Sequence, residues 1–210
     1  MDASTAGIIL LFVVTIFSSL GGNRNYTVSY NSKPESNTQI VTPAPVPSSP
    51  VSNSLDWHFA GAGDMAVAGS IQKYITKYRS PDEAAEISSS IVRHAQTYDV
   101  NPKLVAALIA RESRFNPRAR SSSGAMGLGQ LLPSTCKTVG VEDGFDIDQN
   151  AKGTVRYMKY LLDKFQAFSD PVSFSIAGYL EGPNGVARNR GYSSHAQLYI
   201  NDIFEVYNKI

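Results

Sequence analysis

From Ser80 to the C-terminus, apolar side chains recur at helical spacing, and helix-start signals recur with them. Ser80, Pro81 and Glu83 combine an N-cap hydroxyl, a first-turn proline and a capping-box acid. Asn101 and Pro102 repeat the cap and the proline. Strand-type alternation is scarce over the same stretch, so the sequence predicts an all-α domain.

The individual helices follow from the same spacing and caps. They are expected at residues 81–95, 102–112, 126–132, 133–139, 149–165 and 195–208. Asp148 is the expected N-cap of the longest one, because it directly precedes the apolar pattern that ends at Phe165.

Glu112 stands out in this pattern because it is a carboxylate at the end of an apolar stripe. Residues four apart share a helix face, so Leu104, Leu108 and Glu112 form one row. Burial in apolar surroundings raises the pKa of a carboxyl, and a glutamic acid that stays protonated near neutral pH can act as a general acid. Glu112 is therefore the candidate catalytic acid. From the helix alone, the alternative is an ordinary solvated glutamate.

A serine- and glycine-rich segment follows this helix. Gly124 and Gly127 permit a tight turn and close backbone approach, which a groove for a bulky saccharide requires. Gln130 offers an amide donor and acceptor that suit a sugar acetamido group. Each residue alone is explained equally well by turn chemistry or solvation, whereas their grouping after Glu112 favours a saccharide site.

The segment after Glu112 also resembles a known family. The matching positions come at fixed spacing: Ser113, Phe115, Asn116, Pro117, Ala119, Ser121, Gly124, Ala125, Gly127, Leu128, Gln130, Leu132, Pro133 and Thr135, then Tyr179, Gly182, Pro183, Tyr199 and Ile200. This pattern resembles the soluble lytic transglycosylase family of lysozyme-like enzymes, which cut the glycan strands of peptidoglycan. The resemblance covers roughly residues 84–208 and implies a goose-type, lysozyme-like helical fold.

The resemblance also implies roles for particular residues. Glu112 corresponds to the family's single catalytic acid, which protonates the β-1,4 bond between N-acetylmuramic acid and N-acetylglucosamine. It then takes the proton of the muramyl 6-hydroxyl, which attacks the anomeric carbon and leaves a 1,6-anhydro product. Ser113, Gln130 and Tyr179 resemble residues that support the acid or bind the sugar. No cofactor is implied.

Four positions depart from the family pattern. Gly129 stands where Met is common, Leu180 where Asn is usual, Glu181 where a small residue is normal, and His195 where the last helix often begins with Glu. Glu181 leaves open a muramidase that hydrolyses the same bond, with this second carboxylate activating water. Gly129 and Leu180 leave open a non-catalytic wall-binding or virion structural protein.

Charge and metal-ligand patterns exclude other classes. The formal net charge is +1 with no basic stripe, so nucleic acid is not an expected partner. The histidines are scattered and the single Cys136 lacks a neighbouring ligand or base, so no metal site and no thiol chemistry are expected. Asp143 and Asp146 lack the spacing of a calcium loop and favour turn and capping roles.

Upstream of the helical domain, the chain divides into three stretches. Residues 1–23 contain an uncharged apolar run and predict a signal peptide or membrane anchor. Residues 24–54, rich in Pro, Ser and Asn, predict a disordered linker, and residues 55–79 a pre-domain segment with a short helix. Residues 80–210 form the expected catalytic domain. It would face the periplasm or cell wall, or lie at a virion membrane, with a secretion, conjugation or virion assembly partner.

Overall fold

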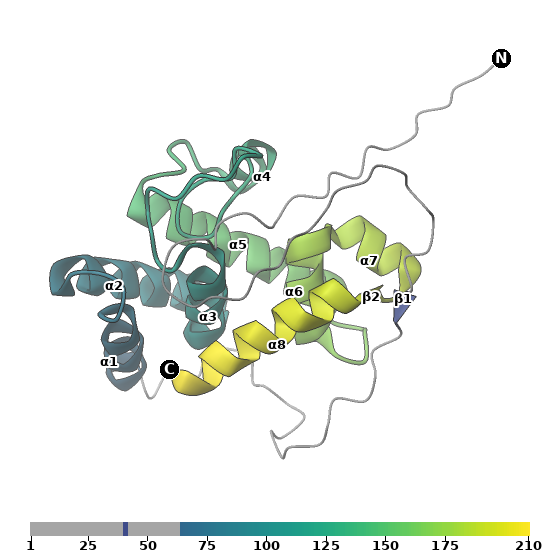
Figure 1. Cartoon of the computed structure of the whole chain (residues 1–210), viewed down its shortest axis with the longest axis horizontal. Helices are drawn as coiled ribbons and strands as arrows, with labels where there is room; N and C mark the ends of the chain where they lie inside the picture. Colours follow the sequence, from purple (N-terminus) through teal and green to yellow (C-terminus); the bar gives the residue numbers. More distant parts are fainter. Residues whose placement is uncertain (1–39, 42–63) are drawn as a thin grey trace, which may run out of the picture. The chain divides into compact units, whose positions relative to one another are not determined.

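A computed structural model of the chain describes residues 40–41 and 64–210 (Figure 1). The elements within this part are β1 (Ile40–Val41), α1 (Asp64–Ile75), α2 (Pro81–Tyr98), α3 (Pro102–Ser113), α4 (Pro133–Val139), α5 (Ile147–Phe165), α6 (Pro171–Glu181), α7 (Pro183–Asn189), β2 (Tyr192–Ser193) and α8 (Ser194–Lys209). The two short strands pair antiparallel, and all other regular elements are helical. The prediction of an all-α fold is confirmed.

Every described element lies within one compact unit, residues 36–210. The predicted signal or anchor at residues 1–23 lies outside the described residues. So does the predicted linker at residues 24–54, apart from the two residues of β1. Across the described part of the chain, no helix is both long enough and apolar enough to cross a bilayer.

Helix pairs distant in the sequence build the core. The α2 helix packs against α5, α5 against α6, and α3 against α8. The buried face of α5 contains Val155, Met158 and Leu162, none of which is solvent-exposed. Each such side chain contributes about 1.5–3 kcal/mol through burial, so α5 is a central support of the fold.

The α1 helix shares this core. Ile71 and Ile75 are fully buried, and the ring of Tyr74 lies 6.3 Å from that of Phe115, measured between centroids. The helix expected somewhere in residues 55–79 thus packs directly on α2 and α3. The described helical body thus includes α1, which precedes Ser80.

The helix caps agree with the sequence at two places and differ at a third. The Ser80 hydroxyl accepts from the backbone N–H of Glu83 at 3.3 Å, and Asn101 caps α3. Asp146, rather than Asp148, caps α5, because its carboxylate accepts from the N–H of Gln149 at 2.8 Å. The prediction for Asp148 is wrong because α5 begins at Ile147, two residues before the expected start, and Asp148 lies in its first turn.

Residues 126–132 do not form the predicted helix. Met126 makes isolated β-bridges with Arg120 and Leu131, and the paired N–H and C=O groups of Met126 and Leu131 are 3.0 Å apart. Gly127 has a φ of +69°, which an α-helix does not accommodate. The chain turns back on itself here, and helix resumes at α4 as predicted.

Candidate active site

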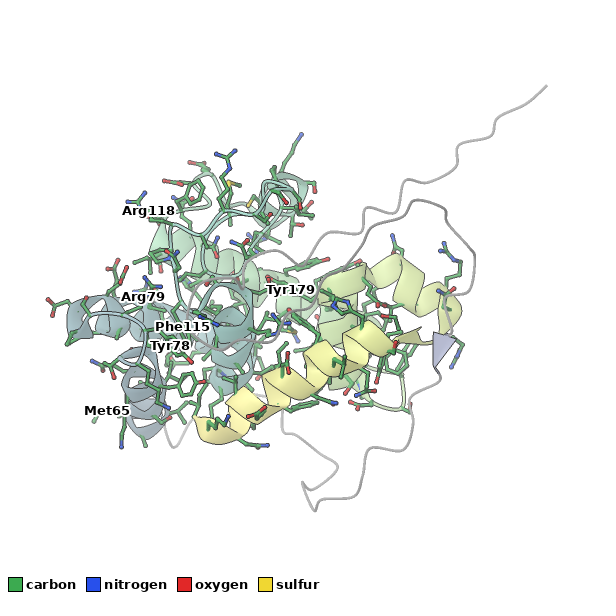
Figure 2. The ribbon with its side chains drawn as sticks, in the orientation of Figure 1. Met65, Tyr78, Arg79, Phe115, Arg118 and Tyr179 are labelled. Atoms are coloured by element: carbon green, nitrogen blue, oxygen red, sulfur yellow. The ribbon has the colours of Figure 1, made fainter. Side chains whose placement is uncertain are left out.

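Glu112 lies in the last turn of α3, and the chain reverses immediately after it. Arg114 and Phe115 have φ of +52° and +59°, the left-handed conformation that ends helices. The Phe115 side chain is fully buried, with ring centroids of Tyr74 and Tyr78 at 6.3 and 6.0 Å. Figure 2 shows Phe115 beside Tyr78. This aromatic anchor fixes the end of α3 and therefore the position of Glu112.

The Glu112 carboxyl is partly buried between α3 and α8. The hydroxyl of Tyr199, a buried residue of α8, donates to Oε1 of Glu112. Burial raises the pKa of Glu112 from 4.5 to about 7, while the Tyr199 bond and the charge of Arg111 oppose the rise. The carboxyl can therefore release or accept a proton near neutral pH, as a general acid and base requires.

Tyr179 lies on α6 (Figure 2), and its side chain is close enough to Glu112 to sense the charge of that carboxyl. Its hydroxyl donates to the carbonyl of Gly129 at 2.7 Å, and its ring centroid is 5.2 Å from that of Tyr157. Burial, together with the charge of Glu112, raises the Tyr179 pKa well above its usual value. Tyr179 thus stays protonated and joins the glycine-rich loop to α6 within electrostatic range of Glu112.

Gln130 and Ser113 bond to backbone carbonyls. The amide nitrogen of Gln130 donates to Ala119 at 3.2 Å and to Gly127 at 3.0 Å. The Ser113 hydroxyl donates to Ile109, one turn earlier in α3, at 3.4 Å. Gln130 therefore braces the glycine-rich loop, and Ser113 bonds within the helix that carries Glu112.

Asn150, which belongs to no sequence motif, is a fully buried amide on α5. Its Nδ2 donates to the carbonyls of Met126 at 2.9 Å and Gly144 at 2.7 Å, and its Oδ1 accepts from the N–H of Gly129 at 2.8 Å. One side chain thus holds two loops on α5. The available signal was a polar residue on the buried face of the predicted long helix, with Thr154 one turn later.

Two glycines are needed for this close packing. A Cβ at Gly127, which has a positive φ, would lie 2.1 Å from the carbonyl oxygen of Gly144. At Gly129 a Cβ would lie 2.0 Å from Oγ1 of Thr154. The departure from the family's common Met at Gly129 has a local reason, because the Thr154 side chain fills the space.

Glu181, the last residue of α6, accepts hydrogen bonds from Ser193 at the start of α8. Its carboxylate accepts from the hydroxyl and the N–H of Ser193, and the Ser193 hydroxyl also caps α8 by accepting from Ala196 at 3.1 Å. Leu180 packs against the core, and His195 is exposed in the first turn of α8. The carboxylate of Glu181 therefore joins α6 to the start of α8.

A second bound carboxylate, Asp148, joins α5 to α2. It accepts from the Ser90 hydroxyl at 2.9 Å, contacts Nε2 of His94 at 2.7 Å, and pairs with Arg93. Partial burial opposes ionisation, but the bonds from His94, Ser90 and Arg93 outweigh it and lower the pKa of Asp148 to about 2. Asp148 is thus a charged link between helices.

Other polar side chains have local roles. Asp143 accepts from the N–H of Phe145 at 2.8 Å, as in an Asx turn. The Cys136 thiol is buried in α4, and burial raises its pKa. Within the described residues, no three or more His, Cys, Asp or Glu side chains gather into a group that could hold a metal ion.

Relatives with known names share this domain. A phage PRD1 protein named "Transglycosylase" is 34% identical over 110 residues, covering 51% of this chain and 40% of its own length. A "Membrane-bound lytic murein transglycosylase F" from Desulfosudis oleivorans is 33% identical over 110 residues, covering 48% and 24%. The chain thus spans less than half the length of either relative.

The fold has solved counterparts. The 70 kDa soluble lytic transglycosylase of Escherichia coli superposes with a TM-score of 0.51 at 17% identity, over 70% of this chain and 29% of that one. An inactive mutant of the lytic transglycosylase Slt from Pseudomonas aeruginosa gives 0.50 at 18% identity, over 69% and 29%. The family model described as "Transglycosylase SLT domain" matches residues 89–201, just over half of the chain. This chain therefore belongs to the transglycosylase SLT domain family, within the lysozyme-like fold.

Proposed function

We propose that this protein is a lytic transglycosylase that cleaves the β-1,4 bond between N-acetylmuramic acid and N-acetylglucosamine in peptidoglycan. The observation that carries the proposal is the Glu112 carboxyl, desolvated at the end of α3, bonded to Tyr199, with a pKa of about 7. Membership of the SLT family adds the substrate class, since the relatives are named transglycosylases or murein transglycosylases.

One carboxyl serves both halves of this reaction. Protonated Glu112 donates to the glycosidic oxygen as the bond to the anomeric carbon breaks. The resulting carboxylate accepts the proton of the muramyl 6-hydroxyl as that oxygen bonds to the same carbon, which closes the 1,6-anhydro ring. Because this nucleophile belongs to the substrate, the attack is intramolecular, and such reactions reach effective molarities of about 10⁵–10⁸ M. A pKa near neutrality suits both proton transfers.

The alternatives are a muramidase and a non-catalytic wall-binding or virion protein. Hydrolysis by a carboxylate pair needs a second acid beside the scissile bond. Glu181 is the candidate the sequence offered, and its bonds to Ser193 assign it to the start of α8 instead. Gly129 also gives less support to a non-catalytic protein, because Thr154 fills the space that a side chain at this position would take. Both features favour the transglycosylase.

Digestion of purified peptidoglycan by the full chain tests the proposal. Mass spectrometry should find muropeptides lighter by one water than the hydrolysis products, with 1,6-anhydro ends. Glu112→Gln should abolish these products, while the matched control Glu181→Gln should keep them. Reducing ends would instead establish a muramidase, and equal loss of turbidity with wild type and Glu112→Gln would remove Glu112 from catalysis.

We also propose that residues 1–23 export the domain or anchor it in a membrane and that residues 24–54 tether it within reach of the wall. The apolar run and the Pro-rich composition support this, as does a relative named membrane-bound. A secretion, conjugation or virion assembly machine is the partner class for local wall opening. Fractionation of cells expressing the full chain, with the mature N-terminus determined by mass spectrometry, distinguishes anchor from cleaved signal. Recovery of the intact chain in the cytoplasm would reject both.

A further inference from the structure

Arg111, the residue before Glu112, connects α3 to α8. Its Nε donates to Oδ2 of Asp202 at 2.9 Å, and its guanidinium carbon lies 5.3 Å from the centroid of the Tyr199 ring. Tyr199 and Asp202 are three residues apart on α8, which places them on the same helix face. Arg111 therefore touches both the residue that binds the catalytic carboxyl and the residue next to it on that face.

We propose that Arg111, whose charge Asp202 partly neutralises, is a positioning residue that covers the Tyr199 ring, keeps its hydroxyl on Glu112 and acts on that carboxyl as a nearby cation. This inference rests on the proposed function for its catalytic meaning, but its physical content concerns Glu112 alone. Four side chains take part, two from α3 and two from α8.

The geometry explains why an arginine suits this place. The guanidinium is planar, so one face covers the Tyr199 ring while an edge donates to Asp202. About 28% of the Arg111 side chain is exposed, against 52% for Asp202, so the ion pair lies at the rim and the ring contact lies inside. The ring of Tyr199 is thereby held between the core and a cation, and its hydroxyl has little freedom to leave Glu112.

The charges around Glu112 give the arrangement a measurable consequence. The groups facing the carboxyl are the Tyr199 hydroxyl from α8, the Tyr179 side chain from α6 and the Arg111 charge from α3. Arg111 favours the ionised carboxylate, and Asp202 offsets that cation. Loss of the Arg111 charge should therefore raise the pKa of Glu112, and loss of the Asp202 charge should lower it. A merely structural brace would not shift the two variants in opposite directions.

The test measures the pKa of Glu112 directly in the full chain. Carbon-13 NMR of protein labelled at glutamate Cδ gives the titration of each carboxyl, and the Glu112 resonance is the one lost in Glu112→Gln. We expect Arg111→Met to raise the midpoint by about 0.5–1 pH unit and Asp202→Asn to lower it similarly. These shifts are smaller than the roughly 1–3 units of a close, uncompensated charge. Arg111→Lys keeps the charge and should stay nearer to wild type than Arg111→Met.

Glu205→Gln provides the control, because it removes an exposed carboxylate on the same helix that pairs with Lys209, and it should leave the midpoint unchanged. Midpoints that stay fixed, or that move the same way in Arg111→Met and Asp202→Asn, overturn the inference. In an active enzyme, the alkaline limb of kcat/KM should follow the NMR midpoints. Opposite NMR shifts in a chain that leaves peptidoglycan uncut would uphold the network and reject the proposed activity instead.

Discussion

Glu112 and Asp148 are two carboxyls that link helices of the same domain, yet their pKa values move in opposite directions. Glu112, between α3 and α8, is partly buried and bonded to a neutral hydroxyl, and its pKa rises to about 7. Asp148, between α5 and α2, is half exposed and meets His94 and Arg93, and its pKa falls to about 2. The charge of the partner and access to water decide whether a carboxyl exchanges protons or stays ionised.

The largest expected difference between the two regions is in activity. Glu112→Gln should lower kcat/KM on soluble muroglycans by about 10²–10⁴-fold, the usual contribution of general acid–base catalysis. Asp148→Asn keeps the Glu112 region intact and should stay within a few-fold of wild type below its unfolding temperature. Rates of anhydro-product formation measure both. A loss in Asp148→Asn as large as in Glu112→Gln would break the comparison.

The second expected effect is on stability. Asn150 makes buried hydrogen bonds to uncharged groups, whereas Asp148 on the same helix makes partly exposed ion pairs. Asn150→Leu leaves the N–H of Gly129 and the carbonyls of Met126 and Gly144 unpaired. Each unpaired buried group costs about 1–3 kcal/mol, so the free energy of unfolding should fall by roughly 3 kcal/mol or more. Asp148→Asn should lower the free energy of unfolding by less, because exposed ion pairs contribute about 0–1 kcal/mol.

Urea unfolding monitored by circular dichroism measures these two losses. Asn208→Leu, at an exposed position of α8, is the matched control and should change stability little. A smaller loss in Asn150→Leu than in Asp148→Asn would show that the amide does not hold the loops as the contacts imply.

A third effect is the pH dependence of stability, which should have opposite signs at the two carboxyls. The folded chain holds the Glu112 proton more tightly than the unfolded chain, so stability falls as pH rises from 4.5 through about 7. Relative to Glu112→Gln, the wild type should lose up to about 3 kcal/mol between pH 4 and pH 8. For Asp148, stability is present above pH 3.8 and is lost as pH falls through about 2.

Unfolding free energies of wild type, Glu112→Gln and Asp148→Asn, measured from about pH 2 to about pH 8, test these two opposite pH dependences of stability. If the difference in unfolding free energy between wild type and Glu112→Gln stayed constant from pH 4 to pH 8, Glu112 would have an ordinary pKa in the folded chain.

The smallest effect concerns the hydroxyl on Glu112. Tyr199→Phe removes a bond that favours the ionised carboxylate, so the pKa of Glu112 should rise further above about 7. The alkaline limb of the pH–rate profile should move up by about 0.5–1 pH unit. Tyr207→Phe is the control, because it removes another hydroxyl of α8, which accepts a hydrogen bond from Asn101 and not from Glu112. An unshifted limb in Tyr199→Phe would contradict the assigned role of the bond.

Local signals explain what the sequence could predict. The caps at Ser80 and Asn101 and the apolar row ending at Glu112 involve residues within a few turns, so α2 and α3 follow from spacing, whereas the choice of Glu112 as the candidate acid also needed the family resemblance. The family pattern included Tyr199 as a helix motif, but its bond to Glu112 joins residues 87 positions apart. No local pattern contains such a contact.

The errors have the same physical origin. Residues 126–132 carry enough apolar side chains for a helix, but Asn150 on α5 binds their backbone groups and holds a turn. The place of Asp148 directly before the apolar pattern predicts a cap, whereas its side chain bonds to Ser90 and His94 of α2. Tertiary contacts override local preference at both places.

The dependence of Glu112 on Tyr199 also has a consequence during synthesis. Translation runs from the N-terminus, so the ribosome releases α3 long before α8 is complete. Until the last helix docks, the glutamate faces water, ionises like a free amino acid and has no proton to deliver at neutral pH. Under the proposed function, the chain therefore gains its general acid only when α8 has folded against α3.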